Sequence, residues 1–180
     1  MKKQVTLYST FLFPFWFLLL MPNMWLILIA TQMIIVSFVL IGALKHIGVD
    51  DVPSVWRKSI LWNTFYGFLA YLVASGLLVP TQFVNENTSA GTWFLEHITY
   101  PVAENPFSGV FAFLYTLLAV AVGALIVYFA NRKISFRKTS LTPEQTHKVC
   151  LYLAIFSAPY FVFVPSTVFY AKMAGMITML

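Results

Sequence analysis

Long apolar runs dominate this chain and restrict it to a fold inside a membrane. Each run is close to the roughly 20 residues that a helix needs to cross the hydrocarbon core. Only 9% of the residues are charged and 60% are hydrophobic, whereas soluble domains carry about 25% charged residues. We therefore predict an all-α polytopic membrane protein, with residues 1–180 forming a single membrane-embedded helical domain. The expected spans are residues 5–21, 24–44, 60–79, 109–130 and 149–170.

The basic residues between these runs predict how the chain is threaded. The stretch 80–107 contains three Glu and one His but no Lys or Arg, whereas the loop 131–148 is rich in both. Because basic loops stay in the cytoplasm, stretch 80–107 is expected outside and loop 131–148 inside. Five spans in a cell inner (plasma) membrane then place the N-terminus in the cytoplasm and the C-terminus in the periplasm. The alternative has four spans, with residues 5–21 forming an interfacial or re-entrant helix.

Local signals predict where several helices begin or bend. Asp50 or Asp51 is expected to cap the helix that leads into the third span. The sequence Thr-Pro-Glu-Gln, beginning at Thr142, is typical of a capping box. Pro159 and Pro165 are expected to bend the last span, because proline cannot donate a helical hydrogen bond.

The outer stretch 80–107 is expected to hold a short amphipathic helix capped by Thr92. We interpret this helix as an aromatic surface anchor, with a lid or a sensor as alternatives. A metal site there is disfavoured, because the stretch has one His and no ligand pair at helical spacing, and no cofactor is expected. The residues that would form this surface are Trp93, Phe94, Glu96, His97 and Tyr100.

No expected span has a charged residue or a His near its middle. Proton-coupled carriers and voltage sensors depend on such residues, so both classes are disfavoured. Polar side chains inside the spans would either line a path or make hydrogen bonds between helices, worth about 0.6 kcal/mol each. The three that we expect to be most informative are Gln32, Asn63 and Thr116.

Small residues recur at helical spacing in the third and fourth spans. Small side chains let helices approach closely in lipid, so these positions would pack the bundle internally or pair protomers in a homo-oligomer. They are Gly67, Ala70, Ala74, Ala119 and Gly123.

The loop 131–148 is the most basic segment of the chain. Anionic lipid is one expected partner, at about 1 kcal/mol for each basic residue near the surface, and a cytoplasmic protein is the other. Direct nucleic-acid binding is not expected. The basic side chains are Arg132, Lys133, Arg137, Lys138 and Lys148.

These patterns favour a non-enzymatic membrane subunit that oligomerises or docks a cytoplasmic partner through its basic loop. In size and threading the chain is similar to accessory membrane subunits such as immunity proteins, secretion components and the membrane halves of two-gene defence systems. A membrane-status sensor in a small defence or stress system fits this outline. One alternative is a pore or permease component for a neutral or apolar solute. Another is a lipid-modifying enzyme, which would need Glu96 and His97 together in a cleft.

Overall fold

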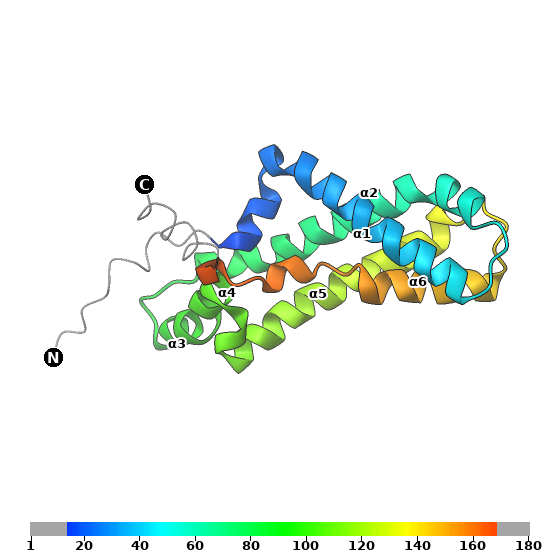
Figure 1. Ribbon diagram of the computed structural model, residues 1–180. Helices are drawn as coiled ribbons and strands as arrows, with labels where there is room; N and C mark the ends of the chain where they lie inside the picture. The colour runs from blue at the N-terminus through cyan, green and yellow to red at the C-terminus, as the bar shows by residue number, and fades with distance from the viewer. Residues whose placement is uncertain (1–13, 169–180) are drawn as a thin grey trace.

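The computed structural model describes residues 14–168, which form helices and turns without a strand in that range. Four helical segments of this part are long and apolar enough to cross a membrane. The prediction of an all-helical fold is confirmed, and the four segments suggest a membrane protein (Figure 1). The segments are Pro22–His46, Val52–Phe83, Val110–Ser135 and Pro143–Phe163.

The long segments contain the α-helices α1 (Trp25–His46), α2 (Val52–Leu78), α5 (Val110–Ala130) and α6 (Pro143–Phe156). Two short α-helices, α3 (Ser89–Phe94) and α4 (Tyr100–Glu104), lie between α2 and α5. The remaining elements are the 3-10 helices η2 (Phe15–Leu20), η3 (Pro22–Met24), η4 (Val79–Phe83), η6 (Pro106–Ser108) and η8 (Tyr160–Phe163), and the π-helical turns η5 (Leu95–Thr99) and η7 (Asn131–Ser135).

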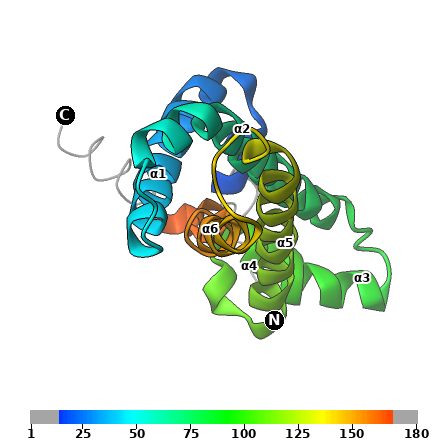
Figure 2. The same ribbon diagram turned by 90° about the vertical axis from the view of Figure 1, so that its right-hand side faces the viewer.

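The four long helices form a ring in the order α1, α2, α5 and α6. Each packs against two neighbours in this ring, and α6 closes it by contacting both α5 and α1 (Figure 2). The chain turns from α1 into α2 at Gly48, whose φ of 70° is in the left-handed region that favours glycine. There the amides of Gly48 and Val49 donate to the carbonyls of Lys45 and Leu44, which forms a Schellman motif.

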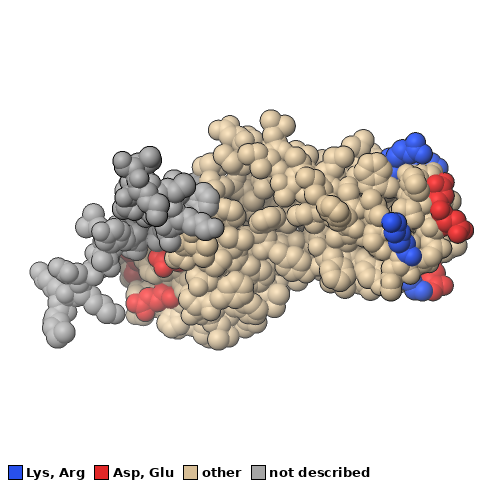
Figure 3. Space-filling model, viewed as in Figure 1, with Lys and Arg blue, Asp and Glu red and all other residues tan. Residues whose placement is uncertain are grey.

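Charge separates the two ends of the bundle. The turn between α1 and α2 and the loop between α5 and α6 meet at one end, which carries all the described Lys and Arg residues; we name it the basic end. The opposite end holds α3 and α4 and carries Glu86, Glu96 and Glu104; we name it the acidic end. Figure 3 shows tan surface between the two charged ends. The exposed surface of the long helices includes large apolar side chains, such as Leu26 and Phe38 on α1.

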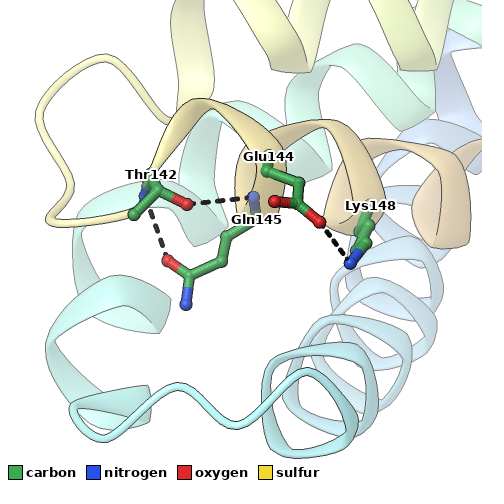
Figure 4. Close-up of polar contacts among 4 residues, drawn as sticks. All are labelled: Thr142, Glu144, Gln145 and Lys148. Atoms are coloured by element: carbon green, nitrogen blue, oxygen red, sulfur yellow. Dashed lines mark hydrogen bonds and ion pairs between the residues drawn. The ribbon is translucent and has the colours of Figure 1, made fainter.

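Two of the predicted helix starts are found. The Asp51 carboxylate accepts from the Ser54 amide at 3.1 Å and caps α2, so Asp51 and not Asp50 is the capping residue. At α6, the Thr142 hydroxyl accepts from the Gln145 amide at 3.2 Å, and the Gln145 side chain accepts from the Thr142 amide at 3.0 Å (Figure 4). This reciprocal pair is the predicted capping box.

The last predicted span is interrupted close to Pro159. Helix α6 ends at Phe156, and the chain continues through Pro159 into the 3-10 helix η8. The interruption frees helical carbonyl groups in an apolar region, where unpaired backbone groups are costly. The Tyr160 hydroxyl donates to one of them, the Ile155 carbonyl, and Tyr71 donates to the Ala158 carbonyl just after the helix.

The predicted first span, residues 5–21, lies mostly outside the described residues. Its described part is not a continuous α-helix, because η2 is a six-residue 3-10 helix and Met21 after it is extended (φ −81°, ψ 122°). Pro22 explains this change, since the residue before a proline is pushed out of the helical region. Phe15 and Trp16 are tied to the acidic end by bonds to Ser166 and Val102.

Candidate interaction site at the basic end

The basic loop that joins α5 to α6 is folded onto the bundle. Ser135 and Asn131 are buried in the π-helical turn η7, where the Ser135 hydroxyl donates to the Asn131 side chain. Phe136 is only 4% exposed and packs into the core of the basic half. The Thr139 hydroxyl then donates to the Phe136 carbonyl at 2.7 Å. These contacts anchor the backbone of the loop, so the Cα atoms of its charged residues are held in place.

Two of the five basic residues predicted as a docking set make contacts within the chain. The Arg132 guanidinium donates to the Tyr128 hydroxyl at 2.8 Å and lies 5.8 Å from the centre of that ring. The same hydroxyl lies 2.7 Å from Nδ1 of His147. The Tyr128 hydroxyl therefore joins Arg132 of η7 to His147 of α6. Lys148 forms an ion pair with Glu144 at 2.6 Å (Figure 4).

The other three basic residues of the loop are Lys133, Arg137 and Lys138, which we name the loop triad. All three are exposed, and none has a side-chain hydrogen bond or an ion pair among residues 14–168. An anchored backbone with unpaired cations leaves this charge available for an external partner. The structure therefore divides the predicted docking set into a free triad and two residues with partners of their own.

A groove of about 730 Å³ lies beside the loop, between the end of α1 and the first turns of α6. We name it the α1–α6 groove. Its polar end is formed by the first turns of α6, its apolar end by the following turns of α6, and His46 of α1 faces the helix between them. His46 packs edge-on against Tyr152, with ring centres 5.7 Å apart, and Tyr152 stacks on Phe156 at 6.0 Å. The lining residues are His46, Ile47, Thr142, Glu144, Gln145, Lys148, Leu151, Tyr152, Ile155 and Phe156.

A groove with residues of α6 along one side was not predicted from the sequence. Glu144, Lys148, Tyr152 and Phe156 are spaced four apart, which places them in one stripe along the helix. The stripe changes from charged to aromatic in the direction of the bundle centre. That spacing is visible in the sequence, but the contribution of His46 depends on the packing of α1 against α6.

Gln32, Asn63 and Thr116 are all buried but do not share one cavity. The Gln32 side chain packs against Gly67, where a Cβ atom would collide with its amide. Asn63, one turn from Gly67, donates to the Ser59 hydroxyl at 3.3 Å. Tyr115 donates to the Leu77 carbonyl, so Thr116, the next residue on α5, lies close to position 77 of α2. Position 77 is ten residues further along α2 than Gly67, which contacts Gln32. That spacing is roughly 15 Å, so Thr116 is well separated from Gln32.

The five small residues selected from the sequence are buried inside the bundle. Ala70 and Ala74 are fully buried, and Ala119 is nearly so. Gly123 makes room for Pro159, since a Cβ atom at Gly123 would lie 2.5 Å from Cγ of Pro159 and 3.2 Å from the Ala70 carbonyl oxygen. The small residues thus allow the interrupted span to pack against α2 and α5.

At the acidic end, the predicted cap of the short helix is wrong. Thr88 caps α3, accepting from the Gly91 amide at 3.0 Å, while Thr92 lies inside the helix and donates to the Thr88 carbonyl. Gly91 packs directly on the Asn85 carbonyl, where a side chain would not fit. This contact allows the helix to begin at Ser89, one turn earlier than the start predicted from the aromatic residues.

The residues predicted to form an aromatic surface at the acidic end lie on α3 and the elements after it, and the structure divides them between surface and core. Trp93 and Tyr100 are exposed, and Phe94 packs against the core. His97 stacks on Trp93 with ring centres 4.7 Å apart, and its Nδ1 lies 2.9 Å from the Trp93 carbonyl oxygen.

Glu96 and His97 do not meet in a common cleft. Glu96 borders a cavity of about 360 Å³ together with Glu86, and His97 does not line that cavity. Within residues 14–168, no group of three His, Cys, Asp or Glu side chains is placed to hold a metal ion.

Comparison of the chain with protein-family models, with curated proteins and with solved structures gives no match.

Proposed function

We propose that this chain is a non-enzymatic, multi-pass subunit of the cell inner membrane that docks a cytoplasmic partner through the loop triad. The observation that carries this proposal is the combination of three exposed cations, which have no ion pair among residues 14–168, with a loop that buried contacts hold in place. A preordered surface loses less conformational entropy on binding than a flexible one. An acidic surface on the partner is the chemistry that three clustered cations would recognise.

For the orientation, we propose that the basic end faces the cytoplasm and the acidic end faces the periplasm, following the positive-inside rule. We favour four spans over five. The bonds from Phe15 to Ser166 and from Trp16 to Val102 hold the start of the described chain at the acidic end. An N-terminal segment held there would resemble the interfacial or re-entrant alternative.

The competing functions receive less support from the geometry. A polar path would bring Gln32, Asn63 and Thr116 together, whereas each is buried and Thr116 lies well away from Gln32. The small residues that would pair two copies of the chain are buried inside the bundle, so they do not support a homo-oligomer interface. A membrane-status sensor in a defence or stress system stays a prediction.

The experiment is a pull-down of the tagged chain from its native host in mild detergent, with identification of every co-purifying protein. The test variant carries Lys133→Gln, Arg137→Gln and Lys138→Gln. The matched control carries Lys45→Gln, Arg57→Gln and Lys58→Gln, which removes the same charge from three exposed residues at the same end.

Loss of a stoichiometric partner in the loop-triad variant alone is the expected result. Equal loss in both variants would mean general electrostatic attraction to the basic end and would contradict a specific docking loop. A partner retained in both variants would show that it binds elsewhere.

A further inference from the structure

We propose that the α1–α6 groove binds one phospholipid with an amine-bearing, zwitterionic headgroup of the phosphatidylethanolamine class. This inference shares the membrane orientation of the proposed function but does not depend on a protein partner. It rests on the shape of the groove and on the order of the charges at its polar end.

The groove is amphipathic along the direction of the bundle axis. Its polar end lies at the start of α6, at the basic end, and its apolar end lies toward the middle of the bundle. Leu151, Ile155 and Phe156 line the apolar end and are 46%, 48% and 59% exposed. From Lys148 to Phe156 the helix rises roughly 12 Å, which is less than half of the hydrocarbon thickness of about 30 Å. A headgroup, a glycerol unit and the upper part of an acyl chain match this pattern.

The size of the groove suits one bound molecule. Its volume of about 730 Å³ lies within the range of roughly 300–1,000 Å³ that is usual for small-molecule sites. The apolar lining residues are exposed on the side of α6, so they are accessible to an acyl chain.

The charges at the polar end favour a particular headgroup. The Lys148 ammonium and the Glu144 carboxylate lie 2.6 Å apart and are both exposed. His46 lines the same groove against Tyr152, one turn beyond Lys148, and its ring makes no hydrogen bond among the described residues. Lys148 and His46 can donate to a lipid phosphate, while Glu144 can accept from a primary ammonium group. The Glu144–Lys148 pair would then exchange its internal contact for two contacts with the headgroup.

Other lipids fit this arrangement less well. A phosphatidylglycerol headgroup has a phosphate that Lys148 can contact but no ammonium group, so the Glu144 carboxylate would lose Lys148 without gaining a new charged donor. A phosphatidylcholine headgroup carries a quaternary ammonium, which cannot donate a hydrogen bond to Glu144. A helix of another protein could cover Leu151 and Ile155 but would not require the paired charges beside them.

The test is native mass spectrometry of the full chain, with equal amounts of phosphatidylethanolamine, phosphatidylglycerol and phosphatidylcholine that carry the same acyl chains. We expect one bound phosphatidylethanolamine, preferred up to about fivefold over phosphatidylglycerol, as one exposed charged pair would give. Glu144→Gln should remove this preference, and Lys148→Gln should weaken binding of both lipids. Glu96→Gln, which removes an exposed carboxylate at the acidic end, is the matched control and should change nothing.

A further variant, Ile155→Trp, tests the apolar end by filling it while leaving Glu144 and Lys148 unchanged. It should reduce retention of every lipid, and the melting temperature of each variant in detergent serves as the folding control. Equal retention of the three lipids, unchanged by Glu144→Gln, would overturn the proposal and leave a non-specific apolar surface. A dimer mass without bound lipid would also overturn it, because a second copy of the chain would then cover the groove.

Discussion

The two ends of the bundle use their polar groups in different ways. At the acidic end, hydrogen bonds join segments that are far apart in the sequence. Ser166 accepts from the Phe15 amide and donates to the Ala103 carbonyl, and Trp16 donates to the Val102 carbonyl. At the basic end, many polar contacts are local to η7 and the first turns of α6. The loop triad has no such contact among the described residues.

This difference indicates that the acidic end contributes mainly to stability and the basic end mainly to binding. Buried long-range hydrogen bonds at the acidic end close the bundle and fix the first and last described segments. Exposed charges at the basic end contribute little to stability, since isolated surface ion pairs are worth about 0–1 kcal/mol. Substitutions at the acidic end should therefore affect folding most, and substitutions at the basic end should affect binding most.

The largest expected effect is on stability and comes from Trp16→Ala at the acidic end. Trp16 is 1% exposed, and its indole donates to the Val102 carbonyl at 3.2 Å. Removing a buried tryptophan should lower the free energy of unfolding by about 3 kcal/mol, through lost packing and a cavity. The measurement is unfolding of the purified chain in an SDS titration, with the exposed Trp93→Ala as the control. Equal effects of the two substitutions would contradict the role given to Trp16.

A smaller loss is expected from Ser166→Ala. Ser166 is 1% exposed and makes two hydrogen bonds, at 2.8 Å to the Phe15 amide and 2.7 Å to the Ala103 carbonyl. Their removal should cost about 1–2 kcal/mol in the same titration, because both partners lose a bond away from water. Ser140→Ala, at an exposed position of the basic loop, should leave the midpoint unchanged. A null result for Ser166→Ala would mean that these bonds do not close the bundle.

Thr142→Ala tests the local contacts of the basic end. It removes one half of the capping box and should destabilise the chain by about 1 kcal/mol. Its effect should be confined to the first turns of α6, which hydrogen exchange of the Gln145 amide can detect. Protection of that amide equal to the wild type would show that the cap is not formed in solution.

The smallest effect on stability is expected for the loop-triad variant, within about 0.5 kcal/mol of the wild type, as for other exposed positions. Partner capture should nevertheless be lost in this variant. A large drop in the unfolding midpoint would mean that these cations stabilise the fold. It would contradict the assignment of stability to the acidic end and of binding to the basic end.

Features encoded by neighbouring residues could be predicted from the sequence. The capping box at Thr142 and the cap at Asp51 depend on residues three positions apart, and the break near Pro159 follows from the chemistry of proline. The long apolar runs predicted the helical fold for the same reason, since each run needs only its own residues to form a helix.

Features that depend on distant residues could not be predicted in this way. Thr88 caps α3 instead of the predicted Thr92, because Gly91 packs against the Asn85 carbonyl before the helix. The candidate groove was missed because it combines residues of α6 with His46 of α1. The predicted docking set was split because Arg132 reaches Tyr128 and His147, which requires α5 and α6 to be adjacent. Such contacts are set by tertiary packing, which spacing along one helix does not reveal.

The proposed orientation places the two ends on opposite sides of the membrane, with the basic end in the cytoplasm. Its most direct test is cysteine labelling in a Cys150→Ala background, with Ser89→Cys at the acidic end and Ser140→Cys at the basic end. Both serines are exposed. We predict that a membrane-impermeant maleimide added to intact spheroplasts labels the Ser89 variant only, and that the Ser140 variant reacts after lysis. Labelling of the Ser140 variant from outside, or of both variants from one side, would contradict the account.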